Sequence, residues 1–441
     1  LSDEKHLAHA ASADASAFAT RDERILSAAT EIFADTGLRV QRPSEIVAEL
    51  DSLRSQGKPQ FRELRNAGIH RERVTTIAAV DPDQFIQSSR GETLGQFRGA
   101  LDEKLAAVGD YRIEVLTDSK GEALAFVCAR RIGEYGFCME KVRIAHRVKD
   151  TRLGKAVIEH LSQHPLGSTW NQAGEADHQV LTIEDQLLSA SLSQACQRRG
   201  FVLNEVGHLA RLRLFGKWTR ERLQSKLDAL VASGIVERSF AIQLQALASV
   251  GDPESIRQLE QHIHPGKVCF GELQTWIVPI RPEWAQELFD FRIWSYPLFN
   301  AETNLVINPD SVYYKRPRNS PSGEPARILW YVSRQQEKGG NCIRACSALT
   351  RCVRGQIKNL FRQYERMGVF EWKQILEHFE HADAPAAAIE FTDTELLPNP
   401  LSFRRTNEIL VQHGQKANQF TSAVRISSAA FHQIYEELNQ K

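Results

Sequence analysis

The stretch ALAFVCARRIGEYGFCMEKVRIAHRVKDTRLGKA, residues 123–156, decides the fold of the middle of the chain. It contains two apolar runs of strand length, Ala123 to Arg131 and Phe137 to His146. Runs of this kind bounded by turn residues predict two neighbouring strands. A turn containing small residues then leads into a predicted helix from Arg152 to His164. A strand pair followed at once by a helix indicates a mixed α/β domain.

The alternation of strands and helices continues on both sides of this stretch. A helix is predicted from Leu94 to Val108 and a strand from Tyr111 to Thr117. A strand at Val180 to Ile183 and a helix from Leu187 to Arg199 follow, and Gly200 ends that helix. The other strands expected here are Val74 to Val80 and His208 to Phe215. Residues 219–263 carry apolar positions at helical spacing, which predicts two or three connecting helices.

Composition excludes several classes of protein. The chain has 441 residues, 55 basic and 55 acidic side chains, and therefore no net field toward nucleic acid or membrane. It has no apolar run of 18 residues and no signal-peptide pattern near its start, so a cytoplasmic protein with no membrane partner is expected. Seven scattered cysteines make disulfides and a structural zinc improbable, and Cys342, Cys346 and Cys352 fit small buried residues.

The segment from Lys149 to Ala156 is the first candidate binding site. The start of a helix presents free amides and a positive dipole end, which suits a pyrophosphate, and Arg152 and Lys155 would add charge. Basic residues before a helix are also common for structural reasons. The order of elements from Glu92 to Phe215 resembles the GNAT acetyltransferase family, which implies that acetyl-CoA is the cofactor. The resemblance places the cofactor contacts at Val142, Arg143, Ile144, Arg152, Leu153, Gly154, Lys155 and Ala156.

The sequence indicates less clearly which residue would act as the acid or base in the implied acetyl transfer. Where the family often has an Asn and, seven residues later, a Tyr that protonates the leaving thiolate, this chain has Ser189 and Cys196. Cys196 is therefore a candidate catalytic residue, with packing as the alternative. His146, which follows the central strand, is the second catalytic candidate, with a surface or core role as the alternative. Glu140 and Glu184 are further candidate bases.

The start of the chain carries a second constellation. Asp3 stands at the beginning of a helix, and Asp22 follows a short strand, so that two carboxylates could meet at a sheet edge and bind Mg²⁺ or Mn²⁺. The alternative is that both cap helices. The runs 3–11, 18–26 and 37–45 resemble the C-terminal half of a PIN domain, a metal-dependent ribonuclease fold. The resemblance implies that Asp3 and Asp22 are metal ligands and that the other acidic ligands lie upstream of Leu1.

The zero net charge conceals a basic segment. Val312 to Arg366 holds twelve basic and three acidic residues, a net charge of +9, with aromatic residues between them. Basic groups bind phosphates and aromatic faces stack on bases, so RNA is an expected partner. The alternative is aromatics in the core and a solvated charged face. Residues 273–372 resemble an ASCH or PUA-like β-barrel, a fold associated with RNA. The candidate nucleic-acid contacts are Tyr314, Lys315, Arg316, Arg318 and Arg344.

These observations predict a multidomain chain of α/β and α+β units, with a GNAT-like mixed sheet, a PIN-like fragment and a PUA-like barrel. The expected segments are a PIN-like fragment at 1–55, a GNAT-like domain at 72–216, a helical connector at 217–266, an ASCH/PUA-like domain at 267–385 and an extension at 386–441. The leading hypothesis is an acetyl-CoA-dependent N-acetyltransferase acting on an RNA-associated substrate, either tRNA or protein. The alternatives are a toxin-like or regulatory RNA-binding protein or PIN-type ribonuclease with the GNAT-like unit as scaffold, and an adaptor without enzymatic activity.

Overall fold

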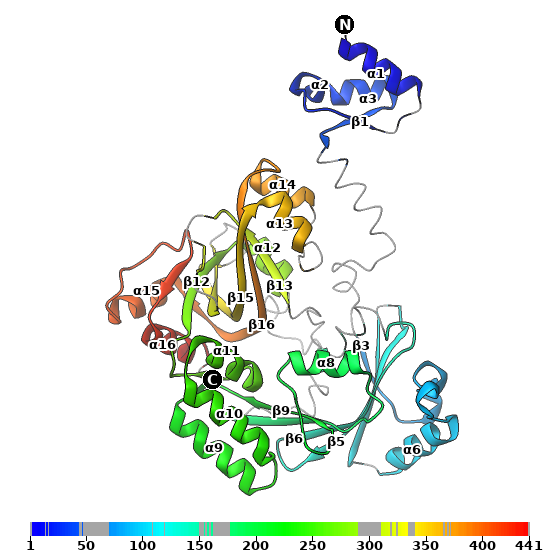
Figure 1. Cartoon of the computed structure of the whole chain (residues 1–441), viewed down its shortest axis with the longest axis vertical. Coiled ribbons are helices and arrows are strands. Elements are labelled where there is room, and N and C mark those ends of the chain that lie inside the picture. The colour runs from blue at the N-terminus through cyan, green and yellow to red at the C-terminus, as the bar shows by residue number, and fades with distance from the viewer. Residues whose placement is uncertain are drawn as a thin grey trace. The chain divides into compact units, whose positions relative to one another are not determined.

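The chain divides into two compact units, residues 1–60 with 370–384 and residues 61–369 with 385–441. The computed structural model (Figure 1) describes only part of each unit. The described residues are 2–13, 15, 17–43, 46, 70–107, 109–118, 120–149, 154, 157, 160–161, 177–289, 310–317, 320–322, 325–333, 340–364, 367, 370 and 372–439. Within these residues, no helix is both long and apolar enough to cross a membrane.

The first unit is built from short elements. They are α1 (Ser2–Ser12), β1 (Ala17–Ala19), α2 (Glu23–Ser27), α3 (Ala29–Thr36) and β2 (Arg39–Gln41), with α14 (Trp372–Phe379) assigned to the same unit. β1 and β2 pair in parallel, with Phe18 opposite Val40. α3 ends at Gly37, whose φ of 71° suits a residue without a Cβ. A helix beginning near Asp3 and a short strand before Asp22 were expected, and α1 and β1 are found there.

A seven-stranded sheet forms the middle of the chain, in the order β3-β4-β5-β6-β7-β9-β8. Its strands are β3 (His70–Arg73), β4 (Tyr111–Thr117), β5 (Ala123–Ile132), β6 (Gly136–Ile144), β7 (His178–Ile183), β8 (Val202–Leu203) and β9 (Leu209–Leu214). All neighbours are antiparallel except β6 and β7. Helices α6 (Leu94–Ala106) and α8 (Ala190–Arg198) accompany the sheet, and their apolar residues Phe97 and Leu192 are buried in its core.

One expected strand of this domain is wrong. Val74 to Val80 holds the short 3₁₀ helix η1 (Ile77–Ala79), and two more follow, η2 (Pro82–Gln84) and η3 (Ser88–Arg90). Val74 and Val80 are nevertheless buried in the core of the sheet. A short apolar run shows that a segment is buried without fixing its backbone conformation, which is why this prediction failed.

Three helices connect the two sheets, where two or three were expected: α9 (Arg220–Ala232), α10 (Arg238–Val250) and α11 (Pro253–Ile263). They are drawn in green in Figure 1. Thr219 and Asp252 cap α9 and α11 by accepting hydrogen bonds from backbone amides. Their apolar faces share one core with Leu212 and Leu214 of β9 and with the parallel pair β10 (Lys217–Trp218) and β11 (Lys267–Val268). The helices are therefore packed on the seven-stranded sheet.

The second sheet has six strands in the order β13-β16-β15-β14-β12-β17. They are β12 (Gln274–Ile280), β13 (Ser311–Lys315), β14 (Ala326–Val332), β15 (Cys342–Gln356), β16 (Pro385–Ser402) and β17 (Val424–Ile426), with helices α12 (Pro282–Phe289), α13 (Ile357–Tyr364), α15 (Phe403–Gln412) and α16 (Ser428–Asn439). Among the described residues the edge strands β13 and β17 do not pair with each other, so the sheet is open. The expected PUA-like barrel is thus not found as a closed barrel in the described part of the chain, because strand patterns in a sequence do not show how a sheet closes.

Candidate functional site

The parallel strands β6 and β7 lie at the centre of the seven-stranded sheet and pair along only part of their length. β6 and β7 pair only from Gly136 to Met139 on one strand and from Val180 to Ile183 on the other. Glu140 is an extra residue in β6, because Cys128 and Ala129 of β5 oppose Lys141 and Met139. Such a bulge bends a strand and redirects its amides. Among the described residues, the carboxyl end of β6 is thus paired only with β5, and its other edge is open to a different partner.

Asp185, the second residue after β7, occupies that edge. The amide of Val142 donates a hydrogen bond of 2.8 Å to Asp185 Oδ2, and Asp185 Oδ1 accepts one from the amide of Leu187. The same carboxylate is paired with the guanidinium of Arg143. The side chains of Arg143 and Asp185 are 2% and 3% exposed, so the pair is shielded from solvent. The amide proposed to contact a cofactor is therefore held by a side chain of the protein itself.

Glu92 completes this network from the other side of Arg143. Its carboxylate accepts hydrogen bonds from Arg143 Nη2 at 3.1 Å and from the Gln87 amide at 3.0 Å. Burial alone would raise the pKa of Glu92, but these bonds and the positive charge of Arg143 outweigh it and lower the pKa. Gln87 in turn accepts a bond of 2.5 Å from Lys149 Nζ. The network ties the segment before α6 to β6 and to the turn that follows it.

Gly154 packs against the turn that follows β6. A Cβ at this position would stand 2.3 Å from the carbonyl oxygen of Val148 and 3.0 Å from that of Lys149, so only glycine permits this approach. Ile144, another expected contact, is buried and opposes Ala125 of β5. The remaining expected cofactor contacts, Arg152, Leu153, Lys155 and Ala156, lie outside the described residues.

The two catalytic candidates occupy different environments. Cys196 is fully buried within the apolar core of the seven-stranded sheet, which favours the packing alternative. His146 is exposed, directly after β6, and its amide donates to the carbonyl oxygen of Gln84. Glu140 accepts hydrogen bonds from Arg130 at 2.6 Å and from Tyr111 at 3.2 Å. Burial alone would raise its pKa, but bonds from Lys104 and Arg130 lower it, so Glu140 is a charged structural partner.

The candidate metal ligands do not form a site among the described residues. No group of three or more His, Cys, Asp or Glu side chains there could hold a metal ion. Asp22 caps α2, because its Oδ1 accepts a hydrogen bond of 2.8 Å from the amide of Arg24. The side chain of Asp3 is outside the described part. The capping alternative is thus observed for Asp22, and nothing in the described part supports binding of Mg²⁺ or Mn²⁺.

The aromatic residues of the basic segment are part of a core. Tyr314 is fully buried with its ring centroid 6.3 Å from that of Phe361, and Tyr313 and Trp330 are buried as well. Buried rings cannot stack on bases, so the expected contact of these aromatic residues with nucleic acid is wrong. The alternation of residues along a strand does not tell which face of the sheet is covered by other segments. Lys315 is only 8% exposed, and burial lowers its pKa to about 8.

Exposed basic groups gather instead where β15 runs into α13. Arg316 is exposed, Arg344 is half-buried, and Arg318 lies outside the described residues. Four further cations at the end of β15 and on one side of α13 form what we name the basic ridge: Arg351, Arg354, Lys358 and Arg362. Within the described part of the chain none of these four makes an ion pair. The ridge therefore presents unneutralised positive charge to solvent.

Sequence reasoning missed Asp185 and Glu92. Asp185 had a signal in the sequence, since it stands just after the carboxyl end of a central strand, where α/β sheets place functional groups. Glu92 had none, because its partner Arg143 is 51 residues away.

Comparison with protein-family models and with curated proteins gave no match. Solved structures similar to part of the chain include ASCH from Zymomonas mobilis, with 19% identity, covering 38% of this chain and 96% of that one at a TM-score of 0.28. Another is a GNAT family acetyltransferase from Elizabethkingia anophelis with acetyl-CoA bound, with 9% identity, coverage of 34% and 99%, and a TM-score of 0.24. A third is the N-terminal domain of Staphylothermus marinus McrB, with 10% identity, coverage of 37% and 93%, and a TM-score of 0.25. The PIN resemblance stays a prediction from the sequence.

Proposed function

We propose that the seven-stranded unit is an acetyl-CoA-dependent N-acetyltransferase whose substrate is RNA-associated, either tRNA or a protein. The observation that supports the transferase is the separation of β6 from β7 after Met139, beyond which the Val142 amide binds the Asp185 side chain and not a neighbouring strand. Gly154 packs closely against the backbone of Val148 and Lys149, which fixes the start of the segment proposed to bind the pyrophosphate. The residues fit the cofactor on one condition, which is that Asp185 releases the Val142 amide.

Acetyl-CoA would supply an activated thioester at this site. Val142 and the turn around Gly154 would bind it through backbone amides, and Arg143 would stay anchored by Glu92 when Asp185 moves. Of the candidate bases, His146 is exposed and Glu184 is half-buried with a carboxylate oxygen 3.6 Å from Arg130 Nη2. Either could accept the proton of an attacking amine, since both reach solvent close to the end of the paired region.

The test of this proposal is the effect of acetyl-CoA on thermal stability. We expect acetyl-CoA to raise the melting temperature of the wild-type protein, because a ligand of the native state stabilises it. Asp185→Asn should bind acetyl-CoA several-fold more tightly, because a neutral acceptor competes less well for the Val142 amide than a carboxylate does. Asp177→Asn is the matched control, since Asp177 pairs with Lys226 near the opposite end of β7 and its loss should leave the affinity unchanged. No shift in either the wild type or Asp185→Asn would contradict the proposal.

The basic ridge supports a role for RNA and also favours the second candidate function, a regulatory RNA-binding protein in which the seven-stranded sheet is a scaffold. Three exposed cations, Arg351, Arg354 and Arg362, and the half-buried Lys358 would bind phosphates by releasing counterions, so affinity should fall steeply with salt. Lys358→Gln combined with Arg362→Gln should weaken binding of a single-stranded RNA and reduce the salt slope by about two. Arg425→Gln, which removes an exposed charge on β17, is the control. If RNA binding does not depend on salt, or if both variants bind RNA equally well, the basic ridge is not the RNA-binding site.

If the protein binds RNA but acetyl-CoA does not raise its melting temperature, the scaffold function is favoured. If the protein binds RNA and acetyl-CoA raises its melting temperature, the transferase is favoured.

A further inference from the structure

The last part of β15 forms an edge of the six-stranded sheet. β14 pairs with β15 only as far as Leu349, whereas β16 stays paired with it to Gln356. Figure 1 shows the two long strands β15 and β16 side by side, with α13 following the end of β15. Among the described residues, the segment 350–356 thus has β16 on one side and no strand on the other. We name this segment, which is about 23 Å long, the open edge.

Most of the open edge is in contact with solvent. Its exposed residues are Thr350, Arg351, Arg354, Gly355 and Gln356. The other two, Cys352 and Val353, are half-buried. A solvent-exposed strand edge offers alternating N–H and C=O groups to which another chain can pair. The open edge is therefore a place where an additional strand can be added to the sheet.

Arginines stand on both faces of the open edge. A Cβ at Gly355 would lie 3.7 Å from Leu360 of α13, so this face of β15, which also carries Arg351, is directed toward that helix. Arg354 is on the opposite face, because side chains alternate along a strand. Glu390 is opposite Arg351 on β16, on the side away from the open edge. The open edge therefore presents positive charge on both faces.

The charges and the backbone groups decide which kind of partner fits. A second copy of the chain would bring its own arginines beside these, and like charges on neighbouring strands oppose pairing. A nucleic-acid strand offers its phosphates as hydrogen-bond acceptors, which leaves the outward C=O groups of the open edge without donors. An extended polypeptide supplies both N–H and C=O groups, and carboxylates on it would attract the arginines. An acidic polypeptide therefore fits the open edge best.

We propose that the open edge binds an extended acidic segment of a partner protein as an additional strand. Two Asp or Glu residues three positions apart in that segment would stand opposite Arg351 and Arg354, one on each face of the sheet. The two residues between them would be opposite the half-buried Cys352 and Val353, where apolar side chains fit. The expected pattern is acidic–apolar–apolar–acidic in either chain direction. This interaction goes beyond the proposed function, and it covers two cations of the basic ridge.

The experiment measures the binding of a fluorescent peptide, Ser-Thr-Glu-Val-Val-Glu-Thr-Ser, to the full chain by fluorescence anisotropy. We expect saturable binding to the wild type. Arg351→Glu combined with Arg354→Glu should weaken it at least about tenfold, because two attractions between neighbouring strands become repulsions. The same double variant should bind a peptide with Lys in place of both Glu, which also shows that the variant is folded. Arg425→Glu, which changes an exposed arginine of the edge strand β17, is the control and should bind as the wild type does.

A second peptide separates strand addition from attraction between charges alone. It carries Pro in place of both Val, so it keeps the carboxylates but loses two neighbouring N–H groups, one of which must point toward β15 in a paired strand. We expect it to bind at least about tenfold more weakly, since a ladder hydrogen bond is lost and Pro does not fit a paired strand. Equal binding of the two peptides overturns the proposal.

The other possible occupants are outcomes of the same experiment. Single-stranded RNA that binds the wild type but not the double variant, while the acidic peptide binds neither, assigns the open edge to nucleic acid and overturns the proposal. Dimerisation of the wild type that the double variant abolishes, again without peptide binding, assigns it to a second copy and also overturns the proposal. Binding of the acidic peptide that the double variant leaves unchanged places the peptide elsewhere, with the same consequence.

Discussion

At the scale of single residues, the central feature is the buried chain Glu92–Arg143–Asp185. Replacing Glu92 with Gln should destabilise the protein by about 1–3 kcal/mol at pH 7, because a charged hydrogen-bond partner of a buried arginine is lost. The folded pKa of Glu92 is below its ordinary value of 4.5, since the bonds from Arg143 and the Gln87 amide outweigh burial. Its contribution is therefore complete above pH 4.5 and is lost as the pH falls through the folded pKa.

Urea unfolding of the wild type and of Glu92→Gln between pH 7 and pH 3 measures this directly. The difference in unfolding free energy should shrink at acid pH as the wild-type carboxylate is protonated. A difference that stays constant across the range would show that Glu92 acts by packing alone.

Single residues also show where sequence reasoning stops. Tyr314 was expected to contact nucleic acid, yet its ring and that of Trp330 are in the core and cannot meet a base. Cys196 matched a catalytic position by counting along a helix, but the side chain is enclosed by apolar neighbours. Which face of an element is covered depends on segments distant in sequence, and no local spacing contains that information.

At the scale of elements, the contact between the end of α8 and α11 depends on one glycine. Gly200 has a φ of +83°, and a Cβ there would stand 2.4 Å from the carbonyl oxygen of Gln261 and 2.9 Å from Cα of His262. Gly200→Ala should therefore lower stability by the cost of a left-handed residue, about 1–2 kcal/mol, and by a further 1–3 kcal/mol, roughly, from overpacking.

Gly207→Ala is the matched control for the packing effect. Its φ of +84° is nearly the same, but nothing lies within 4 Å of the added Cβ. The melting temperature should drop clearly more for Gly200→Ala than for Gly207→Ala. Equal losses would mean that the approach of α8 to α11 adds nothing to stability.

Elements with strong periodicity were predicted well from the sequence. The strand at Tyr111–Thr117 and the three connecting helices were expected where they occur, because alternation and helical spacing are local properties. The full length of β16 could not be predicted in this way: the strand runs from Pro385 to Ser402 and includes Pro398 and Pro400, residues that are typical of loops and strand edges. Pairing with the long strand β15 overrides the local signal of the prolines.

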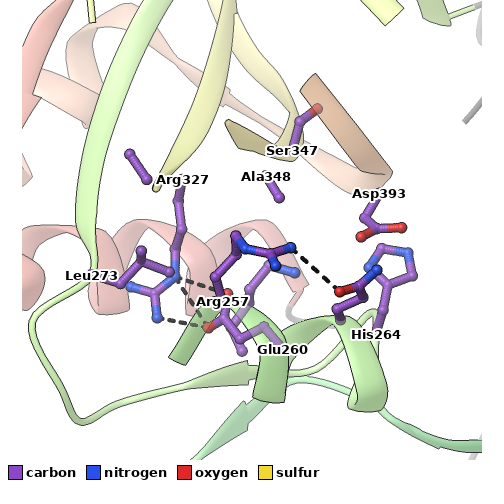
Figure 2. Close-up of a pocket in the computed structure, with 11 residues that line it drawn as sticks. Arg257, Glu260, His264, Leu273, Arg327, Ser347, Ala348 and Asp393 are labelled. Atoms are coloured by element: carbon purple, nitrogen blue, oxygen red, sulfur yellow. Dashed lines mark hydrogen bonds and ion pairs between the residues drawn. The ribbon is translucent and has the colours of Figure 1, made fainter. Parts of the chain in front are cut away.

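At the scale of the whole molecule, the two sheets belong to one compact unit although they were expected as separate domains. Arg327 of β14 and Glu260 of α11, 67 residues apart, form a buried ion pair with side chains 3% and 9% exposed (Figure 2). The hydroxyl oxygen of Tyr435 in α16 lies 3.1 Å from the carbonyl oxygen of Pro265, just after α11. No pattern within either segment predicts such contacts, because each charge is matched only in the folded chain.

Removing one member of the Arg327–Glu260 pair tests whether it joins the connecting helices to the six-stranded sheet. Arg327→Met should destabilise the protein by about 3–5 kcal/mol, because Glu260 loses its ion-pair partner and keeps, within the described part of the chain, the Val268 amide as its hydrogen-bond donor. Arg327→Met combined with Glu260→Gln should recover most of that loss, since glutamine can still accept from Val268 and leaves no buried charge. The four unfolding free energies of this double-mutant cycle give the coupling energy between the two side chains. A coupling below about 0.5 kcal/mol would mean that the pair does not hold the two parts together, and that apolar packing alone makes them one unit.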